Sequence, residues 1–135
     1  MAYEVPVLTA GVWKAAANYS SATDQYTCVV ITSGALVAQL AADGAPVTGV
    51  LQNKPASGSA AEVMCYGITK VRVDPADTIS VGNKVQCTTD AGISASTALG
   101  MYILGRALEA TTTTGVISIL ITHEGFASSA AATGV

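Results

Sequence analysis

The sequence predicts an all-β protein, a small β-barrel or β-sandwich of short antiparallel strands. Short runs rich in β-branched residues alternate between apolar and polar side chains, most clearly in Val116 to Thr122. Turns that contain Gly, Pro, Asn or Asp separate these runs. The ambiguous run, Ala35 to Ala42, fits either a helical face or a strand face. Asp43-Gly44 behind it is typical of a tight hairpin turn, so we predict a strand there.

The strands follow one another with short connections. We predict strands at Tyr26 to Thr32, Ala35 to Ala42, Val47 to Gln52, Glu62 to Val73, Lys84 to Thr88, Met101 to Glu109 and Val116 to Thr122. In the fourth run Val71 and Val73 are expected to face the core, and Gly67 is expected to mark a bulge or a site of close packing. Ile93 to Leu99 is predicted to be irregular, and His123-Glu124 to end the ordered pattern.

The length of 135 residues fits one domain with ragged ends. We expect an extended N-terminal arm at residues 1–21, a β-rich domain at residues 22–124 and a low-complexity C-terminal tail at residues 125–135. Pro6 and the lack of periodicity argue against an early helix. Because it lies outside the strand pattern, we expect that the arm can be deleted without unfolding the β body.

Large aromatic side chains at the two ends are the candidate protein contacts. These are Tyr3, Trp13 and Tyr19 in the arm and Phe126 in the tail. Such rings bury a large area at little entropic cost, so each is expected to anchor its segment against the body or a neighbouring subunit.

The composition indicates a surface that is covered by other protein. Charged residues make up 11% of the chain, against about 25% in an average soluble domain. Hydrophobic residues reach 50%, but aromatics are only 5%, so the core consists of small side chains and gains stability from oligomer contacts. A small, uncharged but soluble domain is the alternative explanation.

Charge and hydropathy argue against nucleic acid and membrane as partners. The net charge is −3, and the six Lys and Arg residues are scattered rather than gathered into the stripe that binds phosphates. No stretch has the roughly 18 to 20 apolar residues of a membrane span, and the N-terminus lacks a secretory signal. The protein is therefore expected to be made in a cytoplasm and to stay soluble.

Catalytic, cofactor and metal sites are not predicted. Asp74 and Asp77 are three residues apart, but without further ligands they are expected to make local turn hydrogen bonds. His123 has no Ser, Cys or metal-ligand partner at useful spacing, so it is expected to be a solvated strand-end residue. The three cysteines, Cys28, Cys65 and Cys87, are expected to be buried thiols.

The order of the central segments resembles the capsid decoration, or cement, proteins of tailed phages. The segments that carry the resemblance are Gly49-Val50-Leu51, Gly67 to Val71, Ile79 to Val85, Gly105 to Glu109 and Gly115 to Ile119. The resemblance covers residues 34–122. It implies a virion protein on the capsid surface, made in the host cytoplasm, that binds the major capsid protein as a homotrimer and clamps neighbouring subunits against internal pressure.

Two other classes compete with this interpretation. A head-fibre or other surface-binding module for carbohydrate or host attachment needs an exposed cluster of aromatic side chains. The aromatic residues are instead dispersed along the sequence, at Tyr3, Trp13, Tyr19, Tyr26, Tyr66, Tyr102 and Phe126. An enzyme needs a nucleophile with its base, a carboxylate pair or a phosphate-binding Gly loop at useful spacing, and the sequence offers none.

Overall fold

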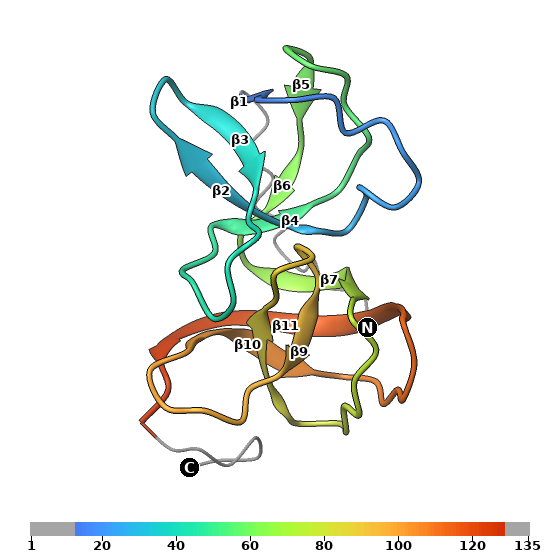
Figure 1. Cartoon of the computed structure of the whole chain (residues 1–135), viewed down its shortest axis with the longest axis vertical. Helices are drawn as coiled ribbons and strands as arrows, with labels where there is room; N and C mark the ends of the chain where they lie inside the picture. Colours follow the sequence, from blue (N-terminus) through green and yellow to red (C-terminus); the bar gives the residue numbers. More distant parts are fainter. Residues whose placement is uncertain (1–12, 129–135) are drawn as a thin grey trace, which may run out of the picture.

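The computed structural model describes residues 13–128, and these residues form eleven β-strands and no helix. The prediction of an all-β fold is confirmed. The strands form two sheets, one in each half of the molecule (Figure 1). With no helix among residues 13–128, the described part of the chain also has no helical membrane span.

The upper sheet is open and has the strand order β5-β1-β3-β2-β4-β6. Its strands are β1 (Trp13–Ala15), β2 (Cys28–Thr32), β3 (Leu36–Gln39), β4 (Gly49–Leu51), β5 (Ala60–Ala61) and β6 (Val63–Met64). β1 runs parallel to β3, and the other pairs are antiparallel. The strand predicted in Ala35 to Ala42 is confirmed as β3.

The lower half is a closed barrel with the strand order β10-β11-β7-β9-β8, in which β8 also pairs with β10 (Figure 1). Its strands are β7 (Gly67–Val73), β8 (Lys84–Cys87), β9 (Ile93–Ala95), β10 (Tyr102–Ala107) and β11 (Gly115–Phe126). Of the five pairs, only β7 and β9 are parallel.

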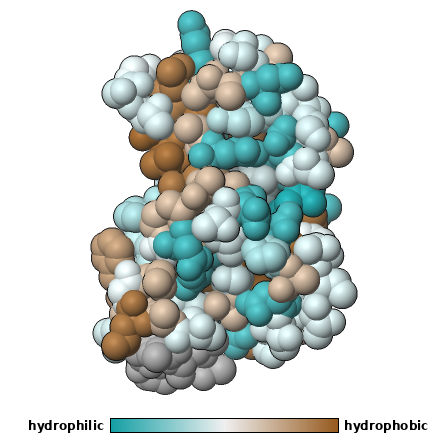
Figure 2. Space-filling model, in the orientation of Figure 1, coloured by the Kyte–Doolittle hydropathy of each residue, from teal (hydrophilic) through white to brown (hydrophobic). Residues whose placement is uncertain are grey.

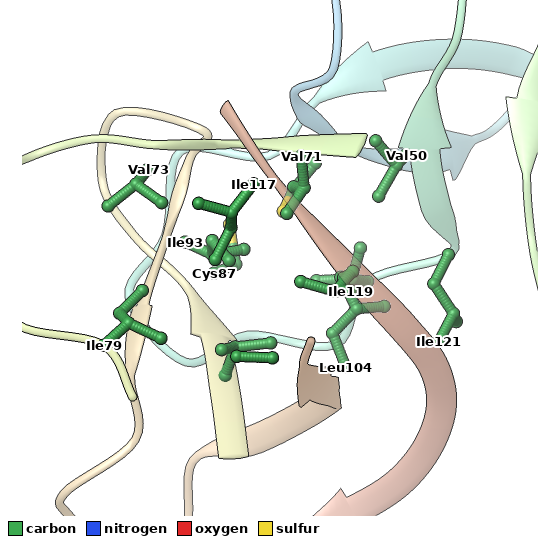
Figure 3. Close-up of a cluster of buried hydrophobic side chains, with 14 of the residues drawn as sticks. Val50, Val71, Val73, Ile79, Cys87, Ile93, Leu104, Ile117, Ile119 and Ile121 are labelled. Atoms are coloured by element: carbon green, nitrogen blue, oxygen red, sulfur yellow. The ribbon is translucent and has the colours of Figure 1, made fainter. Parts of the chain in front are cut away.

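Strict alternation along β11 fills the barrel interior. Ile117, Ile119 and Ile121 point inward and pack with Val71, Val73 and the other members of the barrel core (Figure 3). Such a side-chain-filled interior is typical of a small barrel. The predicted inward orientation of both valines is confirmed.

Three strands of the upper sheet, β2, β4 and β6, separate two cores. A smaller upper core includes Val29, Leu51 and Val63, whereas their neighbours Cys28, Val50 and Met64 belong to the barrel core. Because successive side chains of a strand point to opposite faces, each of these strands contributes to both cores.

The run Glu62 to Val73 is two strands rather than one. The chain leaves the upper sheet after Met64 and enters the barrel at Gly67, whose φ is 103°. Of the two alternatives expected at Gly67, the bulge is therefore wrong. The break in alternation marks a change of sheet, with Cys65 and Tyr66 as the link.

Two further local expectations are wrong. Ile93–Ala95 forms β9 within a stretch predicted to be irregular, because β8 and β7 supply pairing partners that are distant in sequence. β11 continues through His123 and Glu124 to Phe126, where it pairs with Tyr102. The first residues of the predicted tail thus belong to the barrel, and β1 places Trp13 to Ala15 of the predicted arm in the upper sheet.

Candidate interaction surface

Large exposed hydrophobic side chains of the described residues all lie between residues 66 and 126, in the half of the chain that forms the barrel. They are Tyr66, Ile68, Val81, Leu99, Leu108, Val116, Leu120 and Phe126. In the space-filling view, hydrophobic side chains lie along one edge of the molecule, over the upper half as well as over the barrel (Figure 2). Contiguous exposed apolar surface on a soluble domain marks an interaction site.

Four ring side chains form what we call the aromatic row: Tyr66, His123, Tyr102 and Phe126. The ring centroids of Tyr66 and His123 are 4.8 Å apart, those of His123 and Tyr102 6.0 Å, and those of Tyr102 and Phe126 5.7 Å. The two outer rings are exposed, Tyr66 by 50% and Phe126 by 63%. Their edge-to-face contacts are favourable aromatic geometries.

His123 holds the row together. The register between β10 and β11 shifts between Ile103 and Gly105, and His123 has a φ of 48°. Its Nε2 lies 2.7 Å from the carbonyl oxygen of Cys65, and its Nδ1 lies 2.7 Å from the hydroxyl of Tyr102. A carbonyl only accepts, so Nε2 donates, and in the neutral ring Nδ1 accepts from Tyr102. The prediction of a solvated strand-end histidine is wrong.

Tyr102 is partly shielded by this arrangement. Burial raises the pKa of its hydroxyl, and the nearby Tyr66 raises it further. Tyr102 therefore stays protonated at neutral pH and can donate to His123.

An exposed apolar pair extends the surface onto the outside of the barrel. Ile68 of β7 and Leu120 of β11 are direct cross-strand partners, and both are exposed. The next outward-facing pair is Lys70 with Ser118. Since Tyr66 precedes β7 by one residue, the pair lies close to the exposed end of the aromatic row.

An ion pair joins β10 to β11 near the point where the register between these two strands shifts. Arg106 donates through Nε and Nη2 to the two carboxylate oxygens of Glu124, over 2.7 and 2.8 Å. Thr122 Oγ1 donates to the same carboxylate over 3.0 Å. The hydrogen bonds from Arg106 lower the pKa of Glu124, against the opposing effect of partial burial. The bidentate geometry is the strong form of this contact.

The four predicted contact residues have different positions. Tyr3 lies outside the described residues. Trp13 is half-buried in β1 against the upper core. Tyr19 is buried in the upper core, and its hydroxyl accepts a hydrogen bond from the backbone amide of Gln39, so it anchors residues 16–21 to the body. Phe126 alone of the described three is on the exposed surface.

The sequence interpretation missed Tyr66, Tyr102 and His123. It took the aromatic residues as dispersed, but the fold brings Tyr66, Tyr102 and Phe126 together around His123. The local signal that bears on this is the break in alternation at Gly67, which releases Tyr66 from a regular strand. No local pattern indicates that β10 and β11 place their ends beside it.

The remaining reactive side chains have structural roles. Cys28 and Cys87 are buried and free; a hydrogen bond with Cys87, and then burial, raise the pKa of Cys28. Cys65 is free and half-buried. The carboxylate of Asp77 accepts from the amides of Thr78 and Ala95, the first of which is the predicted turn contact. Within residues 13–128 there is no group of three or more His, Cys, Asp and Glu side chains that could hold a metal ion.

Comparison with known protein families shows to which family this protein belongs. The family model for phage cement proteins matches residues 18–134, most of the chain. The chain belongs to the phage cement protein family. The family is one of structural phage proteins, so this cement protein is a structural virion protein associated with the capsid.

The fold of this cement protein also occurs in a solved structure. It is similar to the crystal structure of the N base of the head fiber gp8.5 in bacteriophage phi29, with a TM-score of 0.61 and 16% sequence identity. The match covers 84% of this chain and 92% of the other. A search of curated proteins finds no match to the sequence.

Proposed function

We propose that this cement protein binds the outer surface of the assembled phage head and stabilises it by clamping neighbouring copies of the major capsid protein. The observation that supports this best is the aromatic row, continued by Ile68 and Leu120 on the barrel. Tyrosine is enriched among the residues that contribute most to protein interfaces. Repetition of one modest contact over the whole shell adds avidity that a single contact lacks.

The functional unit in this proposal is a homotrimer on the capsid. The low charged content of 11% supports a largely covered surface. The open upper sheet also supports a surface covered by other protein. Its two edge strands, β5 and β6, are only two residues long and contribute little independent stability. Contacts between copies would add to that stability.

The test is co-sedimentation of the full chain with head particles of the phage that encodes it. We expect roughly one copy per shell subunit. Tyr66→Ala combined with Phe126→Ala is expected to weaken binding at least about 30-fold, because even one hot-spot side chain contributes about 2 kcal/mol and 1.4 kcal/mol corresponds to a factor of ten.

Val81→Ala is the matched control, because Val81 is 65% exposed and belongs to the barrel half but not to the aromatic row. It is expected to bind within about threefold of the unmodified chain. Failure of the unmodified chain to sediment with the particles would refute the proposal. Equal binding by the double variant and the control would instead exclude the aromatic row as the contact.

A head-fibre or host-attachment module is the second candidate. The clustering of Tyr66, Tyr102 and Phe126 favours it, since exposed aromatic rings stack on sugar rings as well as on protein. The fold it shares with the base of a head fiber is consistent with this candidate. A few copies per particle, together with glycan binding that the Tyr66 and Phe126 substitutions abolish, would support this function over clamping.

A further inference from the structure

β6 lies at one edge of the upper sheet, with β4 as its neighbour among the described strands. Val63 of β6 is nevertheless fully buried. Its partner in β4 is Leu51, whose N–H donates to the carbonyl of Thr27 and whose C=O accepts from the amide of Tyr26. Both backbone groups of Leu51 are thus directed away from Val63, and the two residues form a non-hydrogen-bonded pair. The backbone N–H and C=O of Val63 therefore point to the side away from β4.

That side of Val63 is the one on which β1 lies. Alternate residues of a strand direct their backbone groups to the same side, so Val63 faces the way that Ala61 does. Ala61 pairs with Trp13, and the described part of β1 begins at Trp13. A buried N–H and C=O without partners is unfavourable and rare. The position that supplies both partners in a continued ladder is two residues before Trp13, at Gly11.

The register of β1 also fixes the direction from which the chain enters it. β1 is antiparallel to β5, with Trp13 opposite Ala61 and Lys14 opposite Ala60. Each step back along the chain from Trp13 therefore corresponds to a step forward from Ala61, along β6. Tyr66, the half-exposed end of the aromatic row, follows β6 by two residues. The chain before Trp13 is thus directed along β6 toward Tyr66.

Residues 1–12 lie outside the described residues, and their sequence suits this path. Four of them are the apolar residues Val5, Val7, Leu8 and Val12. Pro6 cannot donate to a ladder, so a regular strand is expected only in the residues after it. The eight residues before Thr9 can span up to about 26 Å, which is enough to pass β6 and reach the aromatic row.

We propose that residues 10–12 of the same chain pair with β6, with Gly11 opposite Val63, and that residues 1–8 reach the exposed ring of Tyr66. Pairing gives the buried backbone groups of Val63 their partners and covers a free sheet edge. The same chain is the occupant because residues 10–12 directly precede β1, so their effective concentration at β6 far exceeds that of any other molecule. The first residues of the chain then border the candidate interaction surface.

The direct test is amide hydrogen exchange of the full chain, followed by NMR. We expect the Val63 amide to be protected. Deletion of residues 1–12 is expected to speed its exchange at least about tenfold, because the deletion removes its acceptor. The Leu51 amide is the internal control, since its acceptor is the carbonyl of Thr27. A Val63 amide that exchanges freely in the full chain, or equally slowly in both proteins, would overturn the pairing.

Two proline variants separate the pairing from a general effect on folding. Backbone groups alternate along a strand, so the N–H of Gly11 is directed to Val63 and that of Ala10 to the opposite side. Gly11→Pro removes the first of these donors and is expected to speed the exchange of the Val63 amide, as the deletion does. Ala10→Pro is the matched control and is expected to leave that exchange within about threefold. Equal effects of the two variants would overturn the inference.

Nuclear Overhauser contacts identify the chain that supplies the strand. In a refolded mixture of isotope-labelled and unlabelled chains, we expect a contact between Val12 and Glu62 within each labelled chain and none between labelled and unlabelled chains. A contact between the two kinds of chain would assign the strand to a second copy and overturn the inference.

The ring signals of Tyr66 test the path beyond β6. They are expected to shift on deletion of residues 1–12, and unchanged signals would show that the segment does not reach the aromatic row. None of these measurements uses head particles. Failure of the unmodified chain to sediment with heads would therefore refute the clamp and leave the pairing with β6 intact.

Discussion

The barrel and the upper sheet differ in their free edges, in their cores and in the hydrophobic side chains that they expose. The barrel has no free edge and surrounds a core rich in Ile, Leu and Val, and it carries the large exposed hydrophobic side chains of the described chain. The upper sheet has two open edges, a smaller core and short strands. None of the large exposed hydrophobic side chains of the described residues lies in it. A closed barrel can expose apolar rings without offering an edge for aggregation. This difference is the reason that the proposed contact surface lies on the barrel.

The largest expected effect comes from removing part of the upper sheet. Deletion of residues 1–21 takes away β1, which pairs with both β3 and β5, and the buried ring of Tyr19. We expect a loss of more than about 3 kcal/mol in the free energy of unfolding, since removal of a buried aromatic ring alone costs about that much. Urea denaturation followed by circular dichroism measures it.

Deletion of residues 1–12 is the matched control, because it leaves β1 in place. We expect its circular dichroism spectrum to equal that of the full chain. If the longer deletion is as stable as the shorter one, β1 is dispensable, and the arm can be deleted without unfolding the β body, as the sequence predicted.

Substitution of Gly105 tests how far the stability of the protein depends on close packing in the barrel. A Cβ at this position would collide with the backbone carbonyl of Leu120 and come within 3.0 Å of the Cα of Ile121, and backbone cannot move aside cheaply. Gly105→Ala is expected to destabilise the protein by about 3 kcal/mol. Gly34→Ala, in the upper sheet, meets no atom within 4 Å but has a φ of 81°, so about 1 kcal/mol is expected. Thermal unfolding of the two variants gives the comparison.

His123 tests the connection between the halves. His123→Ala removes the hydrogen bonds to Tyr102 and to the backbone of Cys65 in the link between the sheets. A loss of about 2 kcal/mol is expected, because a part-buried carbonyl and a hydroxyl lose their partner. Tyr102→Phe removes only the hydroxyl contact and is expected to cost about half as much. Equal stability of all three proteins in urea would show that the histidine does not hold the link.

The smallest effect concerns the ion pair on β11. The folded pKa of Glu124 lies below its ordinary value, chiefly because Arg106 donates to it. The pair therefore stabilises the fold above the ordinary carboxyl pKa of about 4.3, and this contribution is lost as the pH falls through the folded pKa. Glu124→Gln is expected to cost less than about 1 kcal/mol at neutral pH. The difference should vanish by roughly pH 2; a difference that persists there would contradict the assignment.

Local patterns predicted the parts of the fold that depend on neighbouring residues. The alternation of Ile117, Ile119 and Ile121 predicted the inward face of β11. The strand β3 was also predicted correctly, but the hairpin expected at Asp43-Gly44 is wrong, because β3 pairs with β1 and β2 and not with β4. β9 was missed, because its short segment becomes a strand only through partners elsewhere in the chain.

The candidate surface was harder to predict for the same reason. Phe126 was identified from its size, but its neighbours Tyr66, Tyr102 and His123 come from separate segments that the pairing of β11 with β10 and β7 brings together. A pocket lined by Asp43, Asp77 and Gln86 likewise combines the loop after β3 with the barrel half of the chain. Asp77 was expected to make only turn contacts, and nothing near it in sequence points to Asp43.

The strands shared by the two cores have a mechanical consequence. In β2, β4 and β6 one residue points into the barrel core and the next into the upper core, as in Cys28 with Val29 and Val50 with Leu51. A force applied to the barrel is therefore transmitted to the upper sheet through side chains on the same rigid backbone. We therefore expect the two halves to resist a force together rather than one after the other.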